Sequence, residues 1–161
     1  MNKKDSFYKT EELLKNYTRI KKSIDFLTQK LENLKKEQSK LKKVLVKSDK
    51  VVLKEEEKNY YYTDETLEND INELMQLIIK TKAEVEFVDS CLKEIEDDEY
   101  YDVIRLWYFE KNYTREKIAE IFDCDLKTIT RNKTRLINKL KYLIFSRDSV
   151  YELIQKDKIL N

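Results

Sequence analysis

Glycine, proline and histidine are absent from this sequence of 161 residues. Because glycine and proline are the strongest helix breakers, their absence predicts long helices. A chain without glycine has no glycine-rich phosphate loop and no nucleophile elbow, and a chain without histidine lacks the commonest general base and zinc ligand. We therefore expect a protein that is not an enzyme and that has no cofactor and no metal site.

Long apolar runs and closely spaced cysteines are also missing. No apolar stretch approaches the length of a membrane span and no signal peptide opens the chain, so we expect a cytoplasmic protein that does not contact membranes. Cys91 and Cys124 lie in helical patterns without CxxC spacing. They are expected to be reduced and to behave as small apolar residues.

Charged residues make up 40% of the chain, which is typical of long solvated helices. The net charge is only +1, but residues 1–50 are basic, residues 51–99 are acidic and residues 100–161 are basic again. This distribution indicates three structural segments.

The first two segments each carry apolar residues at alternating spacings of four and three, which is the pattern of a coiled-coil seam. The first predicts a helix over about residues 11–46, with the seam Leu13, Tyr17, Ile20, Ile24, Leu27, Leu31, Leu34, Gln38, Leu41 and Leu45. The second predicts a helix over about residues 64–96, with the seam Leu67, Ile71, Leu74, Ile78, Thr81, Val85, Val88, Leu92 and Ile95.

The charges that flank the two seams are opposite in sign, basic on the first and acidic on the second. Opposite charges favour pairing, so we expect an antiparallel coiled-coil hairpin within residues 1–97. An intermolecular four-helix assembly is the alternative. The connector, residues 47–63, lacks a turn dipeptide and is expected to be disordered or frayed, although Val51–Leu53 and Tyr60–Tyr62 could pair as short strands.

The third segment opens with the acidic run Asp97–Glu99 and continues as "YYDVIRLWYFE", residues 100–110. Four apolar residues of this stretch recur on one face of a helix. These residues are Tyr100, Val103, Ile104 and Trp107. Acidic residues complement the positive N-terminal end of a helix, so capping and solvation are expected here rather than metal binding.

Two further helices joined by a tight turn are predicted next. Thr114 is expected to cap the first, and Asp123 is expected to take the positive φ of the turn, because aspartate tolerates this conformation better than most non-glycine residues. Asp125 is then expected to cap the second helix. Cys124 is expected to pack under the turn, and Ile129 should lie on the inner face.

The second of these helices is one-sided in charge, with six basic residues and no acidic residue between Leu126 and Lys141. Lysine and arginine anchor phosphates, arginine can also read guanine edges, and threonine can bind phosphate or contact a thymine methyl group. The outer face therefore predicts duplex binding in the major groove rather than simple solvation. Its residues are Lys127, Thr128, Thr130, Arg131, Lys133, Thr134 and Arg135.

The stretch "VIRLWYFEKNYTREKIAEIFDCDLKTITRNKTRLINKL" resembles region 4 of sigma-70-type factors and is similar to phage transcriptional regulators of the ArpU/RinA type. The resemblance covers about residues 100–140. It implies a helix-turn-helix whose second helix binds the major groove, and it carries DNA contacts over to Leu126, Lys127, Thr128, Thr130, Arg131 and Thr134. Two residues depart from the family pattern: Asp123 replaces a glycine, and Asn132 replaces an apolar residue.

We therefore expect an all-α protein with a coiled-coil hairpin at residues 1–97 and a sigma region 4-like helix-turn-helix domain at residues 98–161, which ends in a short helix. The expected function is sequence-specific, phage-type regulation of transcription. Its expected partners are double-stranded DNA, RNA polymerase and further copies of the chain. A complete sigma factor is not expected, because the coiled coil takes the place of a strand-melting domain. The alternative is a coiled-coil adaptor, anti-sigma-like or a phage packaging subunit, whose helix-turn-helix contacts protein.

Overall fold

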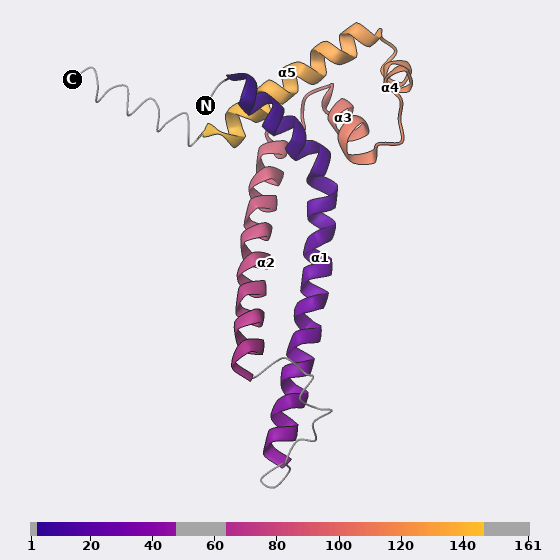
Figure 1. Ribbon diagram of the computed structural model, residues 1–161. Helices are drawn as coiled ribbons and strands as arrows, with labels where there is room; N and C mark the ends of the chain where they lie inside the picture. The colour runs from indigo at the N-terminus through magenta and orange to yellow at the C-terminus, as the bar shows by residue number, and fades with distance from the viewer. Residues whose placement is uncertain (1–2, 48–63, 147–161) are drawn as a thin grey trace, which may run out of the picture. The chain divides into compact units, whose positions relative to one another are not determined.

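Every element in the described part of the chain is a helix. The computed structural model describes residues 3–47 and 64–146. In chain order the elements are α1 (Lys3–Lys47), α2 (Asp64–Lys93), α3 (Tyr101–Ile104), the π-helix η2 (Arg105–Glu110), α4 (Arg115–Ile121) and α5 (Leu126–Ile144) (Figure 1). The prediction of an all-helical chain is thus confirmed for these ranges. Residues 48–63 of the predicted connector and the predicted C-terminal helix lie outside the described residues. Within residues 3–47 and 64–146, no helix combines the length and the apolar content that a bilayer crossing requires.

The helices form two compact units. The central unit is Lys21–Ala83, and the terminal unit combines Met1–Ile20 with Glu84–Asn161. The terminal unit therefore contains α3, η2, α4 and α5 together with the beginning of α1 and the end of α2.

In the central unit, α1 and α2 lie side by side and run in opposite directions (Figure 1). The buried face of α2 follows the predicted seam, since Leu67, Ile71, Leu74 and Ile78 are at most 9% exposed. The seam residues of α1 in this unit, such as Leu31 and Leu34, are half-buried. The apolar periodicity of α2 therefore identified its buried face from sequence.

The core of the terminal unit joins α3, η2, α4 and α5. Its buried residues are Val103, Leu106, Ile118, Ala119 and Ile129, and Tyr100, Trp107, Phe122 and Cys124 pack against them. The positions predicted for Cys124 and Ile129 are therefore confirmed. The hydroxyl of Thr114 accepts a hydrogen bond from the amide of Lys117 at 3.1 Å, so the predicted cap of α4 is confirmed as well.

The first turns of α1 depart from the predicted seam. The helix begins at Lys3 rather than near residue 11, and Leu14, which is fully buried, takes the inner position predicted for the half-buried Leu13. Thr10 and Tyr17 are buried on the same face. The reason is that this part of α1 packs within the terminal unit, where the ring of Tyr17 lies 5.2 Å from that of Phe109 in η2. The four-and-three spacing of α1 predicted contacts between α1 and α2 only.

The helix expected over residues 100–110 changes type partway along its length. Four α-helical residues are followed by the π-helix η2, in which Leu106 and Tyr108 are buried. Lys111 then ends η2 with φ 56°, a left-handed conformation that the sequence did not predict for a lysine. The ammonium group of Lys111 donates a hydrogen bond to the carbonyl oxygen of Lys15 in α1 at 2.7 Å.

Candidate nucleic-acid interface

The turn between α4 and α5 has the geometry that its sequence predicts. Asp123 adopts φ 49°, in the left-handed region. Asp125 caps α5, because its carboxylate accepts a hydrogen bond from the amide of Thr128 at 2.8 Å. The hydrogen bonds from Thr128 and, to a smaller extent, the charge of Arg131 lower the pKa of Asp125. Both predictions, the positive φ and the cap, are confirmed, and α5 therefore begins at Leu126.

The conformation of Asp123 leads to a stability prediction. Glycine adopts positive φ without a steric penalty, whereas a residue with a Cβ pays for it. Asp123→Gly is therefore expected to raise the free energy of unfolding by roughly 0.5 kcal/mol, after the greater flexibility of glycine in the unfolded chain is subtracted. Asp123→Val should instead lower it, because β-branched residues are disfavoured at positive φ. Urea unfolding followed by circular dichroism measures both, and a stabilising valine would contradict this account.

Four of the eight predicted contact residues are exposed at the start of α5: Leu126, Lys127, Thr130 and Arg131. Lys127, Thr130, Arg131 and Thr134 follow the spacing that places residues on one face of a helix. Thr128 and Thr134 are half-buried. In the described part of the chain, neither Lys127 nor Arg131 has a carboxylate within ion-pair distance. Both cations are therefore available to an anionic partner.

The opposite face of α5 holds the helix against the rest of the terminal unit. Ile129, Leu136, Ile137 and Leu140 are all fully buried. The sequence predicted the inner position of Ile129, while Leu143 near the end of the helix is half-buried. This apolar face fixes the direction in which Lys127 and Arg131 project.

Lys133 is turned toward the interior, although its charge predicted a place on the outer face. Its ammonium nitrogen lies 3.4 Å from the Glu11 carboxylate and 4.2 Å from the centre of the Trp107 ring, and its side chain is only 13% exposed. Glu11 also accepts a hydrogen bond from the Tyr108 hydroxyl at 2.7 Å. Lys133 therefore ties α5 to η2 and to the first turns of α1.

The ionisation of this cluster follows from its contacts. Although burial opposes the charged form of Glu11, the hydrogen bond from Tyr108 and the charge of Lys133 lower the pKa of Glu11 below its ordinary value. Burial, together with the hydrogen bond to Glu11, raises the pKa of Tyr108. The guanidinium of Arg115 lies 5.0 Å from the centre of the Trp107 ring, so this indole contacts two cations. The cluster is therefore a neutral tyrosine and an ion pair around one indole.

Arg135 also has partners within the protein, although its side chain is 39% exposed. Its guanidinium makes a two-pronged contact with Asp98, with nitrogen–oxygen distances of 2.7 Å and 2.8 Å. Its Nε donates a hydrogen bond to the Asn132 side chain at 3.2 Å, and the Asn132 amide donates to the Thr128 carbonyl at 2.9 Å. Both polar groups of the Asn132 side chain thus form a hydrogen bond within α5. Arg135 joins α5 to Asp98, which precedes α3.

The Asp98–Arg135 pair predicts a pH dependence. The hydrogen bond from Arg135 lowers the pKa of Asp98 to about 2. Because the pKa is lower in the folded state, the pair stabilises the fold above the unfolded pKa of about 4, and this contribution is lost as the pH falls from about 4 to about 2. Because Arg135 is 39% exposed, solvent screening limits the contribution to roughly 1 kcal/mol.

Asp98→Asn removes the charge and keeps an oxygen that can accept the hydrogen bond from the Tyr100 amide, which measures 3.0 Å in the native chain. The variant is expected to be less stable than the native chain by roughly 1 kcal/mol at pH 7 and equally stable near pH 2. Urea unfolding of both chains across this pH range measures the difference. A difference that stays constant with pH would show that the charge of Asp98 does not stabilise the fold.

Sequence reasoning missed Glu11, Trp107 and Asp98 as partners of the basic residues of α5. The acidic run at residues 97–99 predicts a helix cap, and the amide of Tyr100 does donate a hydrogen bond to Asp98. No sequence signal links Asp98 to Arg135 or Glu11 to Lys133, because 37 and 122 positions separate the partners.

The chain was also compared with known proteins. No protein-family model matches it, and neither the curated proteins nor the solved structures contain a significant match. The likeness to sigma-70 region 4 and to ArpU/RinA-type regulators therefore remains a prediction from the residues of this chain.

Proposed function

We propose that this protein is a sequence-specific DNA-binding regulator of transcription, sigma-like and of the phage type. The observation that carries the proposal is the start of α5, where Lys127 and Arg131 are exposed and have no carboxylate within ion-pair distance among the described residues. The same helix contains no acidic residue. A surface helix that served only for solvation would ordinarily mix charges of both signs.

In this proposal α4, the turn and α5 act as a helix-turn-helix. The major groove of B-DNA admits one α-helix, and the first turns of the second helix contact the base edges. Lys127 and Arg131 lie one turn apart and bind phosphates or guanine edges. Leu126 contacts a thymine methyl group, and Thr130 contacts phosphate or a base. The positive end of the α5 dipole adds to the attraction for phosphate.

The proposed set of direct contacts is narrower than the set predicted from charge. It consists of Leu126, Lys127, Thr130 and Arg131, with the half-buried Thr128 and Thr134 at its edge. Lys133 and Arg135 act as positioning residues in this proposal, because both already have carboxylate partners within the terminal unit. They fix the orientation of α5, and Lys127 and Arg131 bind the charged groups of the DNA.

The proposed architecture places a coiled-coil hairpin before the helix-turn-helix. Its support is the buried seam of α2 and the opposite directions of α1 and α2 within the central unit. The opposite charges of the two helices also favour their pairing. RNA polymerase is the proposed protein partner of a sigma-like regulator, in addition to double-stranded DNA.

Selection of bound sequences from random duplex DNA by the full-length chain tests the function. A defined sequence motif is expected, and its affinity should fall steeply with salt as phosphate-bound counterions are released. A palindromic motif would indicate a symmetric dimer, and one asymmetric element would indicate the sigma-like mode. Recovery of no motif, with no duplex affinity even at low salt, would reject the proposal.

The protein-adaptor alternative has one observation in its favour. Ile121 at the end of α4 is 51% exposed and Leu126 at the start of α5 is 40% exposed, so apolar side chains flank the turn on both sides. An adaptor would use these side chains to bind protein. Two results together would favour this alternative. The native chain would bind a purified polymerase subunit but no DNA, and Ile121→Asp would abolish the binding of that subunit.

A further inference from the structure

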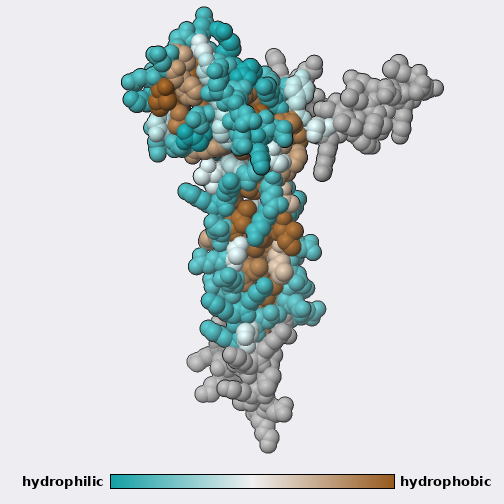
Figure 2. Space-filling model, turned by 180° about the vertical axis from the view of Figure 1, so that it is seen from behind, coloured by the Kyte–Doolittle hydropathy of each residue, from teal (hydrophilic) through white to brown (hydrophobic). Residues whose placement is uncertain are grey.

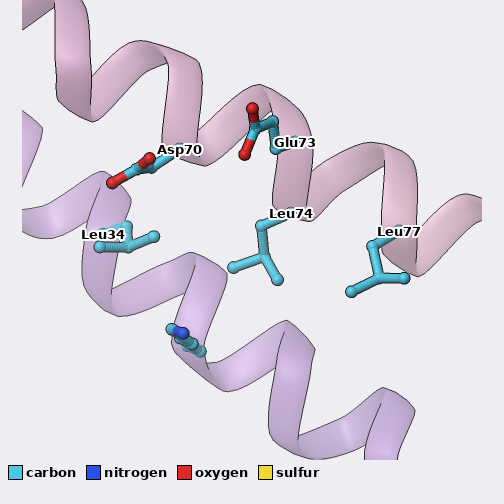
Figure 3. Close-up of a pocket in the computed structure, with 6 residues that line it drawn as sticks. Leu34, Asp70, Glu73, Leu74 and Leu77 are labelled. Atoms are coloured by element: carbon cyan, nitrogen blue, oxygen red, sulfur yellow. The ribbon is translucent and has the colours of Figure 1, made fainter.

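The central unit has a groove between its two helices. Its lining comes from both of them and consists of Lys30, Leu34, Asp70, Glu73, Leu74 and Leu77, around a volume of about 340 Å³ (Figure 3). Leucine side chains from both helices face this space, and charged groups lie at its edge. The groove belongs entirely to residues 21–83.

The apolar floor of this groove is incompletely covered. Leu77 is 49% exposed, and the seam residues of α1 that the pairing should bury, Leu31 and Leu34 among them, are only half-buried. Figure 2 shows apolar surface between hydrophilic residues along these helices. Two helices alone bury only part of each apolar face, so water reaches this floor in the single chain. An assembly of chains that covered this apolar floor would be stabilised by the removal of the floor from water.

The charges at the edge are arranged in a self-complementary way. Lys30 stands on the α1 side, and Asp70 and Glu73 stand on the α2 side. Among the described residues none of these three groups forms an ion pair. A two-fold axis parallel to the helices would bring the same patch of two copies together, so that the basic edge of each copy meets the acidic edge of the other.

We infer that the occupant of this groove is a second copy of the α1–α2 pair, and that the two pairs form a four-helix dimer. Lys30 of each copy faces Asp70 and Glu73 of the other, and the leucines of the two grooves pack against each other. The charges select the pairing, and the buried apolar surface supplies most of the stability. This dimer does not depend on DNA binding, so it can be tested independently of the proposed function.

Leu77→Lys tests the apolar floor. Sedimentation equilibrium of the full-length native chain is expected to show a dimer at micromolar concentration, and the substitution should raise the dissociation constant roughly tenfold or more. Ile79→Lys is the matched control, because Ile79 lies on the same helix, is 64% exposed and does not line the groove. The control should remain dimeric. A native chain that is monomeric at about 100 μM, or a control that dissociates equally, would overturn the inference.

Charge exchange tests the pairing between copies. Lys30→Glu and Glu73→Lys should each weaken the dimer, because each variant opposes like charges across the two-fold axis. An equimolar mixture of the two variants should restore dimerisation, since each reversed charge then meets its opposite. A defect of folding within one chain would not be repaired by mixing. Variants that stay monomeric in the mixture would show that Lys30 and Glu73 do not meet across a dimer interface.

Discussion

Replacement of both Lys127 and Arg131 by alanine is expected to weaken binding to the selected duplex roughly 100-fold, because each contact contributes about 1–3 kcal/mol. Both side chains are exposed and make no ion pair in the described part of the chain. The substitutions should therefore leave the free energy of unfolding within about 0.5 kcal/mol of the native value. Fluorescence anisotropy with a labelled duplex measures the affinity, and urea unfolding measures the stability.

A matched control separates local contacts from a general effect of charge. Lys22→Ala combined with Lys36→Ala changes the net charge by the same amount, and both lysines are exposed on α1 in the central unit. This variant is expected to bind the duplex with nearly native affinity. Equal losses in the two double variants would indicate a diffuse electrostatic attraction and would remove α5 from its proposed role.

Ile129→Ala is expected to lower the free energy of unfolding by about 2–4 kcal/mol, because it removes buried carbon atoms and leaves a cavity. Ile129 is fully buried in the core that α5 shares with α3, η2 and α4. The Ile129→Ala substitution should also weaken duplex binding at temperatures where the variant begins to unfold. Urea unfolding followed by circular dichroism measures the change in stability.

Ile121→Ala is the control for this substitution, because it deletes the same atoms from a side chain that is 51% exposed. Its expected effect is within about 0.5 kcal/mol. If the two variants proved equally stable, Ile129 could not be a core residue and α5 could not be oriented by its apolar face.

Local patterns in the sequence predicted much of the fold. The four-and-three spacing identified the buried face of α2 from Leu67 to Leu92, because periodic burial is a property of neighbouring turns of one helix. The caps Thr114 and Asp125 were also predictable, because a cap bonds to an amide only a few residues away. The left-handed conformation of Asp123 followed from its place between two apolar patterns.

Contacts between distant segments were not predictable in the same way. The heptad gave no indication that the first turns of α1 leave the seam and bury Leu14 in the terminal unit. The basic residues of α5 look alike in sequence, yet Lys133 and Arg135 face carboxylates while Lys127 and Arg131 do not. The charge of a basic residue predicts an anionic partner. The fold determines whether that partner is a carboxylate of the same chain or a group of another molecule.

We propose that Lys127 and Arg131 neutralise phosphate charges of a DNA duplex, and the salt dependence of binding measures this neutralisation. The logarithm of the affinity of the native full-length chain should fall linearly with the logarithm of the salt concentration, because bound counterions are released. The slope should become shallower by about one to two in the Lys127→Ala and Arg131→Ala double variant. A variant with the native slope would contradict the claim, as would a native chain without duplex affinity at low salt.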